Sequence, residues 1–325
     1  MKKVISLLLT VILLLCSFSF IMPAYAADFT EADLDLSQYT MDDLMNMSAE
    51  EYRALLRDFE RVYDPFGTYE TDPIMAEEEQ EPGITPYWGS GDIKNDEYVE
   101  QGSHEMITAQ ALNVLVNDQG VFTDSAVEVL VVCLTISLAS LLPDTKEVGF
   151  LFAGHFYHAI DGDNYLGSTS NTALTNCTSH FNQAVSAAKA GNMDVAYEQI
   201  GWALHYIQDA GEPHHAANIV NIPLIKTAHE DFETYVDDRI DTYINLISSA
   251  YGFNANYSYA IARRNSVGYF VKGTATMAYN YRNMVNNASD TSQWNSVARV
   301  TVPNSVAFSA FLLFKFFFAA GIPLS

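Results

Sequence analysis

The chain has 325 residues, with 40 acidic and 16 basic side chains and a net charge of −24. This charge argues against non-specific binding to polyanions, so no nucleic acid partner is expected. Three cysteines are too few for a fold held together by disulfides. Cys133 and Cys177 are the two outside the first 26 residues, and one disulfide or two free thiols are equally open.

The N-terminus has the pattern of a secretory signal peptide. Two lysines precede an apolar run over residues 4–22, and Ala24 and Ala26 form a small-residue cleavage site. We therefore expect residues 1–26 to be removed and the protein to be secreted into the extracellular medium.

The next segment, residues 27–87, is strongly acidic. It carries 17 acidic and 3 basic side chains and few aliphatic ones. Such a composition buries too little apolar surface to order itself, so we expect a largely disordered propeptide with one short helix over 49–62. Residues 88–325 hold the apolar content of a sizeable core and are predicted to form a single domain.

Hydrophobic patterns with the period of a helix dominate this domain, and no series of alternating strands is visible. The fold class expected is therefore all-α, a multi-helix, bundle-like domain. Pro143 is expected to end one helix, and the segment 303–305 to precede the last. The predicted helices cover residues 104–116, 125–141, 172–190, 193–208, 222–250, 257–285 and 306–320.

The last predicted helix is almost wholly apolar, with six phenylalanines between residues 308 and 318. It has two interpretations, a membrane-inserting tail or a central core helix surrounded by its neighbours. Lys315 interrupts the run, which is shorter than the roughly 20 residues needed to span a bilayer. We therefore favour the core helix.

Two pairs of side chains have the spacing of metal ligands on a helix. His205 and Asp209, like His229 and Glu233, are four residues apart and so lie on one helical face. One such pair is common by chance, but two pairs flanking His215 give five nitrogen and oxygen donors of the kind that zinc binds.

More donors lie upstream in His104, Asp144 and His155. Singly, each is more often a capping, loop or buried residue than a ligand. Together with the five donors above they exceed what one tetrahedral ion can use. The set therefore suggests two or three ions.

At this point the sequence resembles the zinc-dependent phospholipases C, a family of secreted bacterial enzymes whose helical fold is shared with the S1/P1 nucleases. The motifs that carry the resemblance are Trp88, Gly102-Ser103-His104, Pro143-Asp144, Gly154-His155-Phe156, His205-x3-Asp209, Pro213-His214-His215-x2-Asn218 and His229-x3-Glu233. The chain resembles the single-domain members of the family.

The resemblance implies three zinc ions. Trp88, through its free amine and carbonyl oxygen, would bind the first with His104 and Asp209. Asp144, His155 and His205 would bind the second, with Asp209 bridging. His215, His229 and Glu233 would bind the third.

The implied reaction is that of a phospholipase C. A zinc-bound hydroxide would attack phosphorus in a glycerophospholipid at a membrane surface, releasing diacylglycerol and a phosphorylated head group. Asp144 is the implied catalytic base. For phosphatidylcholine as substrate, Asp92 would be the acid and Phe152 an aromatic wall near the choline, although Thr145 stands where an aromatic residue is expected.

Three histidines have no counterpart in the family. His214 is out of register and is expected to be an exposed neighbour of the site, and His158 and His180 match no ligand position. His158 stands where the family commonly has Asp, which is a departure from its pattern.

A zymogen follows from the position of Trp88. An α-amine titrates near pH 8 and can bind zinc, whereas the amide nitrogen of an uncut chain cannot. We therefore expect an activating protease to cut after Tyr87, and no stable protein partner is implied.

Two alternatives remain open. An S1/P1-type nuclease acting on single-stranded nucleic acid would share the fold and the three-zinc site, but it would close the third site with Asp instead of Glu233. The other is a zinc-binding or surface-interaction protein whose site no longer turns over.

Overall fold

The computed structural model describes residues 34–62, 102–120, 122–123, 125–147, 151–220, 227–247 and 255–324. The regular elements in these ranges are helices, which confirms the predicted all-α class. Five predicted helices are found close to their expected bounds, as α3 (Ala49–Val62), α4 (Ser103–Gln119), α5 (Ala126–Ala139), α7 (Ala173–Lys189) and α8 (Met193–Asp209). Cys133 and Cys177 are both free thiols.

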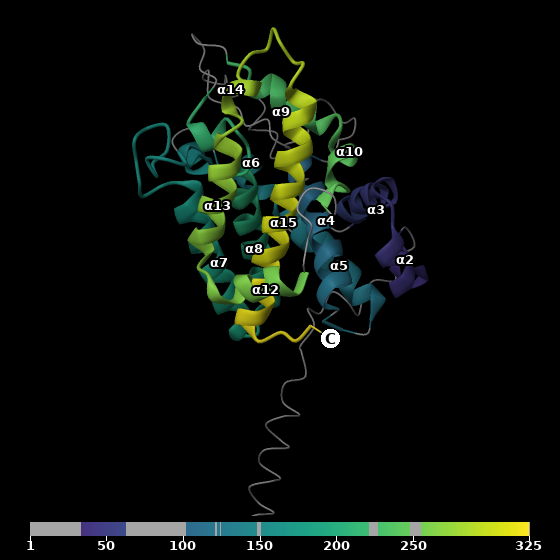
Figure 1. Ribbon diagram of the computed structural model, residues 1–325. Coiled ribbons are helices and arrows are strands. Elements are labelled where there is room, and N and C mark those ends of the chain that lie inside the picture. The colour runs from purple at the N-terminus through teal and green to yellow at the C-terminus, as the bar shows by residue number, and fades with distance from the viewer. Residues whose placement is uncertain are drawn as a thin grey trace, which may run out of the picture.

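Helix α15 (Trp294–Ala320) forms the centre of the body, between α7, α8 and α13 (Val267–Tyr279) on one side and α4 on the other (Figure 1). It is long and apolar enough to span a bilayer, yet 72% of its most apolar window is buried within the protein. The prediction of a core helix is therefore confirmed: a helix that is apolar all round needs neighbours all round.

The start of α15 was predicted wrongly. The helix begins at Trp294 and continues through Pro303, whereas the sequence pattern placed its start after that proline. A proline inside a helix removes one backbone hydrogen bond and usually breaks the helix. Here Val302 and Val306 are fully buried on either side, so tertiary packing outweighs the local preference.

Two long predicted helices are each divided in the structure. The first is replaced by α9 (His229–Asp237) and α10 (Ile240–Ile244), and the second by α12 (Ala255–Arg264), α13 and α14 (Arg282–Val285). Ser266 explains one break, because its hydroxyl accepts the backbone N–H of Tyr269 and starts α13.

Pro143 does not simply end a helix. It lies in the first turn of a second, short helix, α6 (Leu142–Lys146), where a proline is well tolerated because its missing N–H needs no partner there. This short helix contains Asp144 and turns the chain toward α8.

Helix α5 is covered on two sides. One side packs on α4 and α8, and Ala139 lies so close to Gly201 of α8 that any side chain at residue 201 would collide with it. The other side packs on residues 34–62, which form the 3₁₀ helix η2 (Leu36–Gln38), α2 (Met41–Asn46) and α3. This second, smaller core is made of Leu34, Leu36, Leu55, Leu56 and Phe59 with Leu130, Val131, Leu134 and Leu138.

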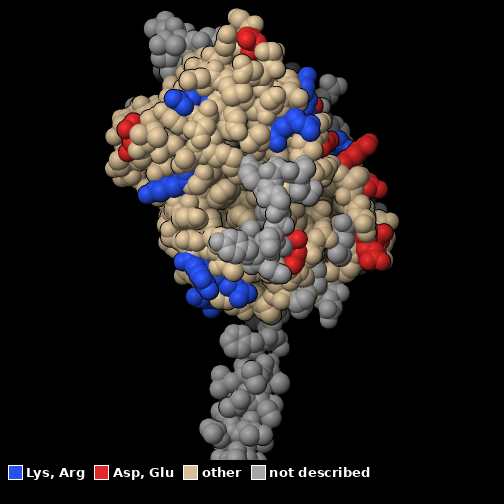
Figure 2. Space-filling view, viewed as in Figure 1, with Lys and Arg blue, Asp and Glu red and all other residues tan. Residues whose placement is uncertain are grey.

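The helix expected over 49–62 is therefore present as α3, whereas the ordered elements η2 and α2 within residues 34–48 were not predicted. The apolar side chains of residues 34–62 are few but share one face, and α5 offers that face a partner that composition alone does not reveal. Figure 2 shows acidic side chains gathered along the outer edge of the molecule, over α2 and α3. Residues 1–33 and 63–101, which include the predicted signal peptide and cleavage site, lie outside the described residues.

The packing of α3 gives a testable prediction. Phe59→Ala removes a fully buried ring and should weaken the docking of residues 34–62 on α5 by about 3 kcal/mol. Hydrogen exchange of the α3 amides should then be faster, with little change in α8. The matched control is Arg53→Ala, which removes a surface ion pair with Asp241 at 2.6 Å and should weaken docking by less than about 1 kcal/mol. Equal exchange in the Phe59→Ala variant and the unaltered chain would contradict this packing.

Candidate metal centre

Helix α8 supplies the first predicted pair. His205 and Asp209 lie on its buried face, with His205 Nε2 3.0 Å from Asp209 Oδ2. His205 Nδ1 donates to the carbonyl oxygen of Ser140 at 2.9 Å, which leaves Nε2 with its lone pair directed at the site. The spacing of four residues therefore places both side chains on one face of α8, as predicted.

Asp144 and His155 reach the same place from α6 and from the 3₁₀ helix η4 (Leu151–His155). Asp144 Oδ1 is 3.4 Å from His205 Nε2 and 3.6 Å from His155 Nδ1, which in turn is 2.9 Å from Asp209 Oδ2. The structure thus brings these predicted donors together.

His104 is held from both sides of its ring. Its Nδ1 pairs with the side-chain oxygen of Gln208 at 2.7 Å, and Nε2 lies 3.5 Å from Asp209 Oδ1 and 3.8 Å from Asp144 Oδ2. The start of α4 is fixed in turn by Asp237 at the end of α9, which accepts the backbone N–H of Ser103 at 3.2 Å. A carboxylate at a helix N-terminus also complements the helix dipole.

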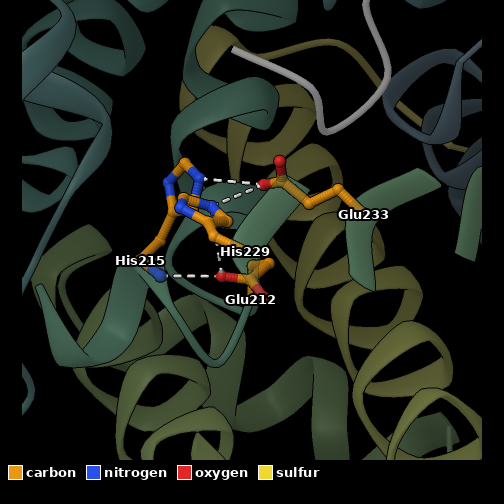
Figure 3. Close-up of side chains that lie close together, drawn as sticks. All are labelled: Glu212, His215, His229 and Glu233. Carbon is orange, nitrogen blue, oxygen red and sulfur yellow. Dashed lines mark hydrogen bonds and ion pairs between the residues drawn. The ribbon is translucent and has the colours of Figure 1, made fainter. Parts of the chain in front are cut away.

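The predicted donors His215, His229 and Glu233 form a second group, with Glu212 added (Figure 3). His229 Nε2 is 2.8 Å and His215 Nε2 is 3.2 Å from the same oxygen of Glu233. His215 Nδ1 pairs with the carbonyl oxygen of His155 at 3.1 Å, so the ring is oriented by backbone. All four side chains are buried.

Three side chains near these donors were missed or misjudged from sequence. His214, expected to be exposed, is fully buried, because its Nδ1 pairs with Glu212 at 2.7 Å and its ring stacks on that of His229. Glu147 Oε2 lies 3.2 Å from His155 Nε2. Glu212 and Glu147 belong to neither of the two helical pairs and to none of the family motifs. Their position near the donors is therefore visible only in the folded structure.

Trp88 and Asp92 lie outside the described residues. Phe152 is 1% exposed, and its ring centre is 4.5 Å from that of His155. Its role as a wall for a choline head group stays a prediction.

The electrostatics of the cluster favour a cation. Burial raises the pKa of Asp144 to about 7. Burial also opposes ionisation of Asp209, but the surrounding histidines hold the pKa of this carboxyl well below its usual range. Burial lowers the pKa of His155, yet Asp209, Glu147 and Asp144 outweigh it and raise the value to about 10. Carboxylates that keep buried imidazoles protonated are carboxylates that a metal ion can neutralise instead, with release of the protons.

Buried polar atoms without hydrogen-bond partners also indicate that these residues could hold a metal ion. Within the part of the chain that the structure describes, His104 Nε2 and Asp144 Oδ2 are buried and have no hydrogen-bond partner. Buried polar atoms are rarely left unpaired without a reason such as an ion. Three buried groups of donors could each hold a metal ion: Glu212, His215, His229 and Glu233; His104, His205 and Asp209; and Asp144, His155 and His205.

Comparisons with known proteins show what the whole chain is similar to. No protein-family model matches the chain. It is 28% identical over 241 residues to a phospholipase C from Clostridium perfringens, covering 66% of this chain and 58% of that one. It is 32% identical over 182 residues to a phospholipase C from Clostridium novyi (51% and 44% covered) and 35% identical over 86 residues to one from Listeria monocytogenes (26% and 29% covered).

Solved structures show the same fold. An alpha toxin from Clostridium absonum superposes with a TM-score of 0.55 at 22% identity, covering 66% of this chain and 63% of that one. These findings confirm the resemblance to the bacterial phospholipases C and their all-α fold. The chain spans less than two thirds of the length of the curated relatives above.

The contact between His104 and Gln208 can be tested without metal. Gln208 also donates to the hydroxyls of Thr108 and Ser309, at 2.9 and 3.2 Å. Gln208→Met keeps the volume but leaves these buried partners unpaired, so the free energy of unfolding of the metal-free protein should fall by about 2 kcal/mol. Urea denaturation in the presence of a chelator measures this loss.

The matched control is Gln199→Met. Gln199 pairs with His180 Nδ1 at 2.7 Å in the same way, but at a half-buried position outside the three donor groups. Its loss should lower the free energy of unfolding by less than about 1 kcal/mol. Equal losses in the two variants would show that Gln208 has no special structural role.

Proposed function

We propose that this chain is a secreted, zinc-dependent phospholipase C that hydrolyses the phosphodiester of glycerophospholipids, with phosphatidylcholine as the first substrate to test. The observation that carries the proposal is the Asp209 carboxylate, which lies within 3.6 Å of nitrogen atoms from four histidines on four elements. Such a carboxylate suits a bridge between two ions. The similarity to relatives that are phospholipases C supports phosphodiester hydrolysis as the reaction.

The donor chemistry fits zinc, which takes imidazole nitrogen and carboxylate oxygen in sites of four ligands. We assign three ions: one to Trp88, His104 and Asp209, one to Asp144, His155, His205 and Asp209, and one to His215, His229 and Glu233. When bound, zinc would lower the pKa of a coordinated water toward 7 and neutralise charge on the phosphate.

The chain's own residues would orient the reactants and move the proton. We assign the general base to Asp144, because its Oδ2 is buried and has no hydrogen-bond partner among the described residues. Ser140, Gln208 and the carbonyl of His155 would keep three imidazole rings in fixed orientations.

The nuclease alternative is not favoured, because the relatives reported above carry the name phospholipase C. The substrate is proposed to lie at a membrane surface, and secretion is inferred from the signal-peptide pattern of residues 1–26.

Asp144→Asn tests the assignment of the base. The substitution keeps the size of the side chain but removes its basicity, so release of phosphocholine from phosphatidylcholine vesicles should fall by about 10²- to 10⁴-fold with the helical content unchanged. Asp290→Asn changes an exposed carboxyl on the surface and should leave the rate unaltered. Hydrolysis of single-stranded DNA by the unaltered protein, with no phosphocholine released from lipid, would reverse the proposal in favour of a nuclease.

Processing gives a second test. We propose that residues 27–87 keep the enzyme latent because the nitrogen of Trp88 cannot bind zinc while it is part of a peptide bond. The chain starting at Trp88 should therefore bind one more zinc ion than the uncut precursor and be the more active of the two. Metal analysis, N-terminal sequencing and assay of both forms measure this difference. Equal zinc content and equal activity in the two forms would disprove this mechanism of latency.

A further inference from the structure

Glu212 is a buried carboxylate for which the family resemblance provides no role. It lies in the turn after α8, three residues beyond Asp209, and is 0% exposed. Its Oε1 accepts from His214 Nδ1 at 2.7 Å, and its Oε2 accepts the backbone N–H of His215 at 2.7 Å. In the part of the chain that the structure describes, no Lys or Arg forms an ion pair with it.

The Oε2 atom of Glu212 faces the second donor group. Glu212 Oε2 is 3.9 Å from His229 Nε2, and Glu212, His215, His229 and Glu233 each place one donor atom within 4.8 Å of the others. Figure 3 shows the carboxylate of Glu233 beside the imidazoles of His215 and His229, and the carboxylate of Glu212 below these rings. Two donor atoms on one tetrahedral zinc lie roughly 3.4 Å apart when each bond is about 2.1 Å, so a small inward movement of the wider-spaced donors would close the group on one ion.

We propose that Glu212 is a fourth protein ligand of the ion held by His215, His229 and Glu233, which makes this site a closed one. The inference rests on the proposed function in so far as that function requires zinc. Four protein ligands saturate a tetrahedral zinc and are typical of structural sites, whereas catalytic sites keep one position for water. The water chemistry would then belong to the ions around Asp209, and the third ion would mainly hold α9 against the turn after α8.

Charge supports a ligand role over a purely structural one. A buried carboxylate is costly unless a cation or several donors compensate it. Two carboxylates balance a divalent ion fully, whereas Glu233 alone would leave one positive charge on the ion and one negative charge on Glu212 beside it. Oε2 has a second lone pair beyond the one that accepts the N–H of His215, and this lone pair is available to the ion.

Glu212→Gln in the zinc-loaded, full-length chain tests the proposal. Gln keeps the size and an acceptor oxygen but loses the charge. One ion should therefore be removed at a chelator concentration more than about 100-fold lower, a larger change than loss of an outer-shell partner causes, while the retention of the others is unchanged. Zinc counted by mass spectrometry during chelator titration is the readout. His214→Gln is the matched control, because it removes the hydrogen bond to Oε1 and leaves the carboxylate in place; it should keep the zinc affinity of the unaltered chain. Equal loss of zinc in the two variants would overturn the ligand role and leave Glu212 a positioning residue.

A second measurement does not depend on any variant folding. In a crystal of the unaltered, zinc-loaded protein, anomalous scattering should place the third ion about 2.0–2.2 Å from Glu212 Oε2. An ion bound by His215, His229 and Glu233 but more than 3 Å from Glu212 would overturn this inference and leave the proposed function intact. A protein that binds no zinc at all would overturn both.

Discussion

The carboxylate of Asp209 is the group around which the rest of the site is arranged. It lies 2.9 Å from His155, 3.0 Å from His205, 3.5 Å from His104 and 3.6 Å from His215, measured between its oxygens and the nearest ring nitrogens. A buried carboxylate is unstable without positive charge nearby, and these imidazoles supply it as protons or share it with metal ions. The four rings come from α4, η4, α8 and η5 (His215–Ala217), so assembling the site requires most of the fold.

The other nitrogen of each ring explains why the histidines hold their orientation. His205 pairs with the carbonyl oxygen of Ser140, His215 with that of His155, and His104 with the amide of Gln208. Partners of this kind fix both the tautomer and the plane of a ligand. Helix α15 provides none of the donors, yet Ser309 accepts a hydrogen bond from Gln208 and so couples the central helix to His104.

The predictions that held were those that depend on local geometry. The pairs His205–Asp209 and His229–Glu233 are four residues apart on a helix, and this spacing alone places both members on one face. Glu147, Glu212 and His214 could not be found in this way, because their positions beside the donors depend on turns between elements. The breaks in the two long helices also escaped prediction, since hydrophobic period does not distinguish one bent run from two short helices.

The order of residues 34–62 could not be predicted from composition, because an acidic segment with few apolar residues is expected to be disordered. Helix α5 is apolar on all sides, so the face turned away from α4 and α8 must be covered by something, and α3 covers it. The cover also reaches the site through a series of contacts: the hydroxyl of Tyr52 lies 3.1 Å from that of Ser137, and the hydroxyl of Ser140 donates to the carbonyl of Ser137 at 2.6 Å. Ser140 in turn orients His205. The proposed cut after residue 87 would sever the chain but leave this packing in place. Release of the segment would then be a separate, non-covalent step, and it would change the surroundings of α5 and, through Ser140, those of His205.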